Sequence, residues 1–412
     1  MDKATRNKFL GVDQIFDYLT EKLLNENIDF VAFVVSPFHI LGVDAYLLEM
    51  KEKYNKHPKG IIFIFPHPKN GIIVNEEHIK CRKFADVEIV YIEDSQVQKK
   101  KDILCSMFNT LRGILYVISQ KNSDRKELFI ISVMHPYFSI FEIFSNKKIA
   151  EYYLPTFVVI DEGVGSYMSK KIWELVSKYD KGIKENITFL NTIKDTFKDI
   201  ILLILQIIKK PIFYIIKVEN RLIFNKYNNI LIPNSSVINS YRKVLKFEKD
   251  ISNKRFILTT KKPTIVIGTQ PFVEYDQITE SKFIELIDEI ITFLEEKGFF
   301  IILKPHPREL LNKYRRLSLK HKNLTIAPNS VLLEDILLSC SPTTIIGFTS
   351  TSLITSKLFY NIYSISIIDI MIKLSDDPLL KILAKEFKLK FQNIICFIDC
   401  IKELTYVIEK LK

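Results

Sequence analysis

The chain is poor in the residues that mark fibrous, disordered or disulfide-stapled proteins. Its 412 residues include 11 glycines, 15 prolines and 5 cysteines. So little glycine and proline excludes a collagen-like or low-complexity chain. The odd number of cysteines, at no metal-ligand spacing, predicts reduced thiols rather than disulfides or a zinc site. With 47% apolar residues, the composition predicts a globular α/β protein.

Long apolar runs are also missing. The N-terminus has no continuous apolar core of the signal-peptide type, which predicts a cytoplasmic protein. The most lipophilic stretch, residues 200–216, is interrupted by Gln206, Lys209, Lys210 and Pro211, whereas a spanning helix needs about 20 apolar residues. We predict a buried helix or a helix lying in the membrane interface. In the second case the protein is peripheral on the cytoplasmic face of the inner membrane.

The common nucleotide and metal motifs are absent from the sequence. It contains neither GxGxxG nor GxxxxGK[ST], so dinucleotide oxidoreduction and P-loop phosphoryl transfer have no support. No DxD tripeptide is present to hold a metal against a nucleotide diphosphate, and no HxxxH or CxxC spacing lies near the candidate loops. We therefore expect no metal and no cofactor.

The net charge of +11 predicts attraction to polyanions or to an anionic membrane face. No block of five or six like charges occurs, which argues against a nucleic-acid tail. We predict no nucleic-acid partner.

Short apolar runs alternate with helical patterns in both halves of the chain, which predicts two Rossmann-like domains facing each other across a central cleft. Polar residues 247–262 mark the junction, giving domains 1–250 and 251–412. The first includes a lysine-rich helical insertion at 164–228, and the last helix of the chain can pack back on this domain. The predicted strands are 29–35, 60–65, 87–92, 128–133, 156–160, 229–233, 264–267, 298–303, 324–327, 343–347 and 364–368. The predicted helices of the second half are 280–297, 307–320, 331–339 and 352–359, and a helix at 41–54 follows the first strand.

An acidic tripeptide, Asp161-Glu162-Gly163, directly follows the apolar run at 156–160. A carboxylate at the carboxyl end of a strand can accept a proton from an incoming hydroxyl. Gly163 has no side chain, so the loop can bend tightly and a ligand can approach. The alternative is a solvated turn, because Asp, Glu and Gly are common loop residues.

A second candidate, Lys304-Pro305-His306-Pro307, follows a buried strand and precedes a predicted helix. The prolines restrict the backbone around His306, and Pro307 suits the first turn of a helix. An imidazole held at a helix N-terminus can protonate or hydrogen-bond a phosphate oxygen, and Lys304 adds positive charge. Other His-Pro dipeptides begin at residues 57, 67 and 135, so only this context singles out His306.

Hydroxyl residues fill a third segment, where Ser350-Thr351-Ser352 follows a strand and precedes the helix predicted at 352–359. One hydroxyl caps the helix, a role that fits Thr351 or Ser352. The remaining hydroxyls and the free helix amides predict a phosphate site.

Two weaker signals complete the second half. Glu334, on the helix before the third segment, can accept hydrogen bonds from ribose hydroxyls or be a plain surface residue. Gly268-Thr269-Gln270, after the first strand of this half, can close against a nucleotide in the same cleft.

The three main signals, in this order on two α/β domains, resemble the bacterial sialyltransferases. Ser36-Pro37-Phe38-His39 after the first strand, together with the chain length, is most similar to the α-2,8-polysialyltransferase-like group. The resemblance implies a GT-B fold and inverting, metal-independent transfer of sialic acid from CMP-sialic acid to a sugar hydroxyl. The first domain would then be the acceptor side and the second would bind the nucleotide donor.

The resemblance also implies roles for individual residues. Asp161 would be the general base, and His306 would assist departure of the CMP phosphate. The residues implied in donor binding are Lys304, Pro305, Glu334, Ser350, Thr351, Ser352, Gly268, Thr269 and Gln270. The residues implied on the acceptor side are Glu162, Gly163, Ser36, Pro37 and Phe38. The order Asp then Glu leaves open which carboxylate is the base, and Ser-Thr-Ser leaves the phosphate register open by one residue.

Two other functions stay open at this point. A capsule or teichoic-acid type transferase using CMP-Kdo or CDP-glycerol would also use the histidine and hydroxyl segments. A non-catalytic scaffold on the membrane would use the basic surface and residues 200–216 to hold a polysaccharide assembly complex. As a sialyltransferase, the chain is expected to act on an anionic or sialylated glycan in capsular polysaccharide, lipooligosaccharide or polysialic acid synthesis, beside capsule assembly proteins.

Overall fold

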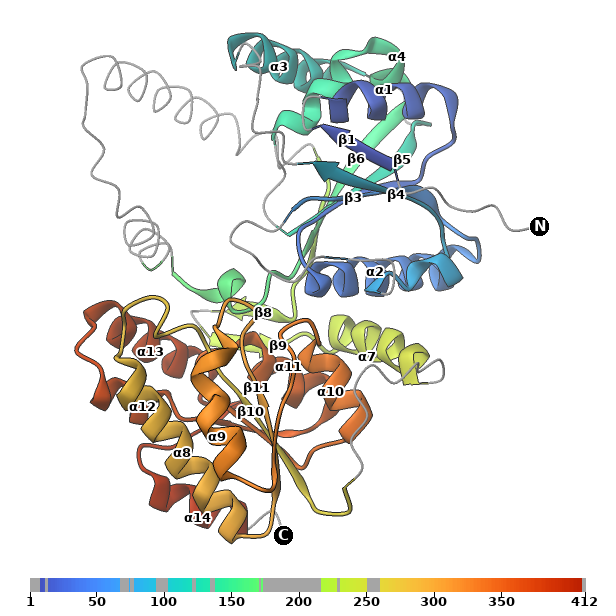
Figure 1. The fold of residues 1–412 in the computed structure, drawn as a ribbon. Coiled ribbons are helices and arrows are strands. Elements are labelled where there is room, and N and C mark those ends of the chain that lie inside the picture. Colours follow the sequence, from blue (N-terminus) through green and yellow to red (C-terminus); the bar gives the residue numbers. More distant parts are fainter. Residues whose placement is uncertain are drawn as a thin grey trace, which may run out of the picture. The chain divides into compact units, whose positions relative to one another are not determined.

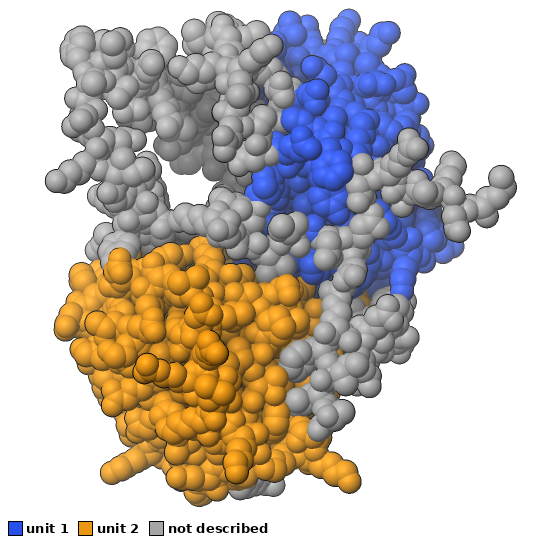
Figure 2. Space-filling model, in the orientation of Figure 1, with its two compact units in different colours: residues 1–66, 74–162, 181–222 blue, residues 67–73, 163–180, 223–412 orange. Residues whose placement is uncertain are grey.

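The computed structural model describes residues 8–11, 14–66, 74, 78–93, 103–120, 124–133, 138–169, 172, 216–227, 230–249 and 260–409. The chain divides into two compact units, coloured in Figure 2. Unit 1 comprises residues 1–66, 74–162 and 181–222, and unit 2 comprises residues 67–73, 163–180 and 223–412. Most of the predicted lysine-rich insertion and of the lipophilic stretch at 200–216 lies outside the described residues.

Unit 1 is built on a seven-stranded parallel sheet with the order β1-β4-β3-β2-β5-β6-β7. Its strands are β1 Lys8–Gly11, β2 Phe30–Val34, β3 Lys59–Ile64, β4 Asp86–Glu93, β5 Lys126–Ser132, β6 Tyr153–Ile160 and β7 Val218–Arg221. Helices cover both faces of the sheet, so its central strands are almost continuously apolar. The helices α1 Ile15–Asn25, α3 Ile103–Ser119 and α4 Lys147–Tyr152 lie on one face and α2 Pro37–Tyr54 on the other (Figure 1). The 3-10 helices are η3 Cys81–Lys83 and η4 Phe138–Ser145.

Unit 2 is built on a six-stranded parallel sheet with the order β12-β11-β10-β13-β14-β15. Its strands are β10 Thr264–Gly268, β11 Phe300–Lys304, β12 Leu324–Ile326, β13 Thr344–Gly347, β14 Tyr363–Ser366 and β15 Cys396–Phe397. Its helices are α7 Ser235–Lys249, α8 Glu280–Glu296, α9 Arg315–Lys320, α10 Leu333–Cys340, α11 Thr351–Tyr360, α12 Ile368–Leu374, α13 Pro378–Phe391 and α14 Ile401–Glu409, with the 3-10 helices η5 Val164–Tyr167 and η6 Leu311–Tyr314.

The core of unit 2 lies between this sheet and the helices on one of its faces. Side chains of α8, α12, α13 and α14 join one cluster with the apolar residues of β10 and β11. Leu404 and Ile408 belong to this cluster, so the last described helix packs on unit 2. Elsewhere in the unit, α7 packs on α11, where the rings of Tyr241 and Phe359 stack 4.9 Å apart.

In each sheet the order of the strands reverses at one point. In unit 1 the chain runs from β2 through β3 to β4 on one side and continues with β5 and β6 on the other. In unit 2 the corresponding reversal lies between β10 and β13. Open α/β sheets bind their ligands outside the carboxyl ends of the strands at such a reversal. Two parallel sheets of this kind confirm the predicted GT-B-type fold.

One predicted strand has a different role from the one expected. Residues 229–233 are predicted as the last short strand of the first half, but β9 Ile230–Pro233 pairs antiparallel with β8 Phe224–Tyr227 in a separate sheet of unit 2. The edge position in unit 1 belongs instead to β7. Its sequence VENR has no run of apolar residues, so its pairing with β6 could not be predicted from periodicity.

Among the described residues, no helix is long and apolar enough to cross a membrane.

Candidate active site

Three predicted segments meet at the carboxyl edge of the unit 2 sheet. Gly268 at the end of β10 is the register partner of Lys304 at the end of β11, and β13 pairs with the other side of β10. Because all these strands are parallel, their carboxyl ends share one edge. The segments after β10, β11 and β13 therefore flank the reversal of the sheet, where the sequence predicted a nucleotide.

Gln270 joins two of these segments directly. Its Oε1 accepts hydrogen bonds from the backbone nitrogen of Thr349 at 2.8 Å and from Thr349 Oγ1 at 3.1 Å. Gln270 thereby holds the segment after β10 against the hydroxyl segment after β13. Gly268 leaves its surroundings open, since the nearest atom to an added Cβ is Ile346 O at 4.0 Å.

Lys304 is a buried cation at this edge, 6% exposed. Its Nζ donates to the carbonyl oxygen of Pro305 at 2.6 Å. Burial lowers the pKa of Lys304 to about 8, while the negative charges of Glu309 and Glu334 act in the opposite direction. The structure thus brings Lys304 and Glu334, predicted to bind the donor, within electrostatic reach of each other.

His306 lies in a turn and not at the start of a helix, which corrects the helix predicted at 307–320. The backbone nitrogen of Glu309 donates to the carbonyl oxygen of His306 at 2.9 Å, closing a turn over residues 306–309. Pro307 occupies the second position of this turn, where its fixed φ is favoured. Helical structure begins only at η6 and continues in α9. The ring nitrogen Nδ1 of His306 accepts a hydrogen bond from the backbone nitrogen of Arg308 at 3.2 Å.

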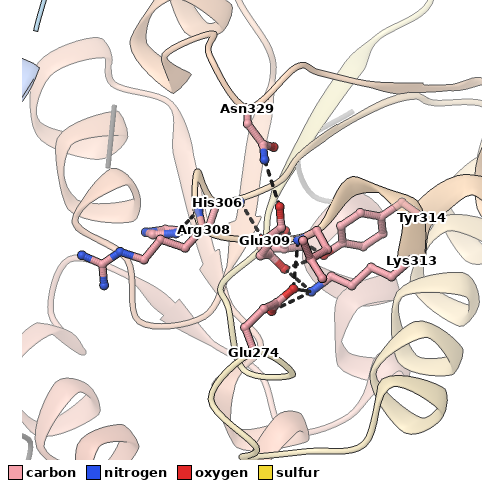
Figure 3. A network of polar contacts seen from close by, with 9 residues as sticks. Glu274, His306, Arg308, Glu309, Lys313, Tyr314 and Asn329 are labelled. Carbon is pink, nitrogen blue, oxygen red and sulfur yellow. Dashed lines mark hydrogen bonds and ion pairs between the residues drawn. The ribbon is translucent and has the colours of Figure 1, made fainter. Parts of the chain in front are cut away.

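Behind this turn lies a buried polar network centred on Glu309 (Figure 3). Its Oε2 accepts hydrogen bonds from Thr269 Oγ1 and from the backbone nitrogen of His306, both at 2.6 Å. Its Oε1 accepts a hydrogen bond from the Tyr314 hydroxyl at 2.7 Å and pairs with Lys313 Nζ at 2.8 Å. This network could not be predicted from the sequence, because a glutamate in a lysine-rich segment is normally exposed.

Two further contacts complete the network. The Lys313 ammonium also pairs with Glu274, whose two carboxylate oxygens are both 3.0 Å away. The side-chain nitrogen of Asn329 donates to the carbonyl oxygen of Glu309 at 2.9 Å. With Thr269 donating to Glu309, both polar residues of the predicted segment 268–270 serve to connect segments within unit 2.

The hydroxyl segment begins α11, and its cap is Ser350. The Ser350 hydroxyl accepts hydrogen bonds from the Ser352 backbone nitrogen at 3.2 Å and from the Ser352 hydroxyl at 2.7 Å. The expectation that Thr351 or Ser352 caps the helix was therefore wrong by one or two positions. The strand β13 ends at Gly347, and Ser350 has an extended backbone. An extended backbone is typical of the residue that caps a helix.

Thr351 instead contacts the glycine of the acidic tripeptide. The backbone nitrogen of Val164 donates to Thr351 Oγ1 at 2.9 Å. Gly163 has a φ of +104°, and a Cβ added there would lie 2.4 Å from Thr351 Oγ1. A glycine is needed at this position both for its backbone conformation and for its close approach to Thr351.

The two acidic residues before Gly163 differ in exposure. Asp161 is 0% exposed, whereas Glu162 is partly exposed. Burial, with the neighbouring charge of Asp161 as the second cause, raises the pKa of Glu162. A carboxyl group with a raised pKa is better matched to accepting a proton near neutral pH.

Ser36, Pro37 and Phe38 begin α2, which starts four residues before the helix predicted at 41–54. The Ser36 hydroxyl accepts from the backbone nitrogen of His39 at 3.3 Å, and Pro37 occupies the first helical position. These residues follow β2, beside the reversal of the unit 1 sheet, and Asp161 follows β6 at the same sheet edge.

One group of possible metal ligands occurs in the described part of the chain. It consists of Asp399, Cys400 and Glu403, which follow β15 at the far side of the unit 2 sheet. The backbone nitrogen of Asp399 already donates to Glu403 at 2.9 Å. None of the predicted site residues belongs to this group.

Solved structures with related architectures include two sialyltransferases. An alpha/beta-galactoside alpha-2,3-sialyltransferase from Photobacterium phosphoreum is 13% identical with a TM-score of 0.41, over 90% of this chain and 99% of that one. The 2,6-sialyltransferase of Photobacterium sp. JT-ISH-224 is 10% identical with a TM-score of 0.44, over 90% of this chain and 78% of that one. The UDP-GlcNAc 2-epimerase of Methanocaldococcus jannaschii is 10% identical with a TM-score of 0.49, over 93% and 92%. No curated protein matches the sequence.

The sequence itself carries the stronger relationship. The family model for alpha-2,8-polysialyltransferase (POLYST) matches residues 30–368. That range begins at β2 and ends at the start of α12, so it includes every site residue predicted from the sequence. The chain therefore belongs to the alpha-2,8-polysialyltransferase family and is a glycosyltransferase.

Proposed function

We propose that this protein transfers sialic acid from CMP-sialic acid to a hydroxyl of a glycan, with inversion at the anomeric carbon and without a metal ion. The observation that carries the proposal is the contact of Thr351 with Gly163 and Val164. The hydroxyl segment proposed to bind phosphate is thereby anchored to the glycine that directly follows the two proposed bases. Transfer requires the base and the leaving-group site to act on the same substrate, so a built contact next to the bases in the chain supports the proposal.

The leaving group is a phosphate monoester, and the unit 2 edge has the chemistry to stabilise it. The amides at the start of α11 and the Lys304 ammonium favour negative charge. His306 accepts at Nδ1, so its neutral ring carries the proton on Nε2. We assign this N–H to a phosphate oxygen of CMP, where it donates as the bond from that oxygen to the anomeric carbon breaks.

The acidic pair supplies the general base in this proposal. The base takes the proton of the acceptor hydroxyl while the acceptor oxygen bonds to the anomeric carbon. The raised pKa and partial exposure of Glu162 favour it as the proton acceptor, with Asp161 as the charge that raises its pKa. The resemblance of the sequence favoured Asp161, and substitution of each residue decides between them.

The acceptor is proposed to be an anionic or sialylated glycan of a capsule or lipooligosaccharide, reached at the inner membrane with capsule assembly proteins. The net charge of +11 supports an anionic acceptor. Ser36, Pro37 and Phe38 at the edge of unit 1 are the proposed contacts. Activity on a long sialylated acceptor should then fall more steeply with added salt than activity on a short neutral one, and equal salt slopes would exclude a role for the basic surface.

The deciding experiment incubates the purified protein with CMP-sialic acid and with lactose-, sialyl- or oligosialyl-terminated acceptors. CMP release and product length report transfer and show whether additions are repeated. Matched incubations with CMP-Kdo and CDP-glycerol test the other donors. Release from either of those, with none from CMP-sialic acid, would refute the proposed donor. No release from any donor, with binding to anionic vesicles retained, would support the scaffold.

A further inference from the structure

The proposed reaction gives no task to the buried carboxylate of Glu309. Its side chain is 0% exposed, and that of its partner Lys313 is 2% exposed. Desolvating two such ions is unfavourable, and apolar side chains of the same volume often give equal or greater stability. A contribution to stability is therefore a weak explanation for this ion pair. The groups that Glu309 holds indicate another one.

Glu309 fixes both backbone groups of His306. Its carboxylate accepts from the His306 nitrogen at 2.6 Å, and its own nitrogen donates to the His306 carbonyl oxygen at 2.9 Å. Pro307, between them, has a fixed φ. One residue thus determines how the His306 backbone, and with it the base of the imidazole side chain, is oriented.

The same turn sets the protonation pattern of the ring. The backbone nitrogen of Arg308 donates to His306 Nδ1 at 3.2 Å, and a protonated Nδ1 could not accept this bond. The neutral ring therefore carries its proton on Nε2. Arg308 precedes Glu309 directly, so its N–H points at the ring only while the turn is closed.

Glu309 is itself held from two other segments. Thr269, after β10, and Tyr314, in η6, each donate a hydroxyl hydrogen bond to its carboxylate. Lys313 adds an ion pair and is held in place by Glu274. These partners hold the carboxylate from several sides, and Figure 3 shows the network of polar contacts around it. Bonds of charged groups in a buried network of this kind are stronger than those at the surface.

We infer that Glu309 is a positioning residue for His306: it closes the turn at residues 306–309 and so keeps the imidazole proton on Nε2. The effect on sialic acid transfer rests on the proposed function, whereas the effect on the histidine ring does not. The two can therefore be measured separately.

The first measurement is the nitrogen NMR spectrum of the full-length protein labelled with 15N-histidine, with His306 assigned by its loss in His306→Asn. The wild-type protein is expected to show the neutral ring with its proton on Nε2. In Glu309→Gln an amide group replaces one carboxylate oxygen, so the donors at that position lose their acceptor. We expect a mixture of the two neutral ring forms.

Glu295→Gln is the matched control. Glu295 is a carboxylate of unit 2 that contacts His321 Nδ1 at 2.6 Å and accepts from the backbone nitrogen of Asn323 at 2.7 Å. Its carboxylate serves His321 and Asn323 and not the turn at residues 306–309, so its substitution should lower stability and leave the His306 spectrum unchanged. Tyr314→Phe removes a single bond to Glu309 and serves as the milder variant if Glu309→Gln does not fold.

The second measurement is the kinetics of transfer from CMP-sialic acid. Glu309→Gln should lower kcat by about tenfold or more and change the donor KM by less than about twofold, because the misplaced group acts in the transition state. Tyr314→Phe should give a smaller loss of kcat, and Glu295→Gln none. An unchanged His306 ring in both Glu309→Gln and Tyr314→Phe overturns the inference, whatever happens to kcat. A changed ring in a protein that transfers no sialic acid supports the inference and refutes the proposed function instead.

Discussion

Two glutamates at the carboxyl ends of parallel strands have opposite surroundings. Glu162, after β6, is partly buried, and the charge beside it is that of Asp161, which contributes to its raised pKa. Glu309, after β11, is fully buried, and hydroxyl, backbone and ammonium groups bind both of its oxygens. The surroundings suit Glu162 to exchanging a proton and Glu309 to holding its neighbours still. Residue type alone does not distinguish the two; the groups around each carboxylate do.

The largest expected difference between the two is in stability. Glu309→Ala should lower the free energy of unfolding by about 3–5 kcal/mol, because it leaves the Lys313 ammonium buried and several donors without an acceptor. Glu162→Ala should cost less than about 1 kcal/mol, since it removes a charge that is disfavoured where it lies. Chemical denaturation followed by circular dichroism measures both. Equal losses would remove the distinction drawn between the two residues.

The contact of Gly163 with Thr351 should matter next most, through activity. Gly163→Ala places a Cβ 2.4 Å from Thr351 Oγ1 at a φ of +104°, so transfer should fall about a hundredfold as the acidic loop is displaced. The double variant Gly163→Ala/Thr351→Ala lacks the Thr351 side chain that the new Cβ would meet, so it should recover part of the lost transfer activity.

Gly298→Ala is the control for the backbone effect in Gly163→Ala. Gly298 also has a positive φ, +84°, but no atom lies within 4 Å of an added Cβ. Its substitution should cost about 1 kcal/mol of stability and leave transfer unchanged. A similar loss of transfer in Gly163→Ala and Gly298→Ala would show that strain alone, and not contact with Thr351, is responsible.

A pH profile distinguishes the roles of the acidic pair. The pKa of Glu162 is raised, so transfer should decline on the acid side at a pH above the ordinary titration of glutamate. Asp161→Asn removes one cause of that shift and should move the acid limb of kcat/KM to lower pH. Glu162→Gln should remove most activity at every pH. If Asp161→Asn is inactive throughout and Glu162→Gln keeps the limb, then Asp161 is the base.

The smallest of these effects is expected from Lys304. Its pKa is lowered to about 8, so it is charged below that pH and neutral above it. With CMP-sialic acid as the varied substrate, kcat/KM should fall severalfold as the pH rises through about 8, because an anionic phosphate loses its cation. Lys304→Met should lower kcat/KM and flatten this limb, whereas Lys320→Met, at a lysine with a 56% exposed side chain, should keep it. If the fall of kcat/KM above about pH 8 persists in Lys304→Met, another group is responsible for it.

The long apolar strands could be predicted from the sequence, and the short polar ones could not. Runs such as Thr264–Gly268 and Phe300–Lys304 are buried on both faces, so their composition reveals them. By contrast, β7 and the two-residue β15 are edge strands, and their pairing depends on the neighbouring strand. The turn after His306 was mistaken for a helix because Pro307 suits the first position of either.

The candidate residues were also predictable in part. Polar side chains directly after apolar strands marked the segments at 161–163, 304–306 and 350–352, since each parallel sheet binds its ligands outside the carboxyl ends of its own strands. The separate roles of these residues could not be predicted from the sequence. The helix cap at Ser350, the contact of Thr351 with Gly163 and the role of Gln270 depend on atoms brought together from distant parts of the chain.

The sequence by itself determined the alternation of strands and helices, the parallel α/β class and the family, because these follow from local periodicity and short motifs. Only the tertiary structure decided which polar groups are buried and which partners they have. Glu309 shows the reason: its environment comes from Thr269, Lys313 and Tyr314, and the first of these is 40 residues away in the chain. The ionic state and mobility of a side chain depend on such neighbours. Tertiary packing brings these neighbours together, although they are far apart in the sequence.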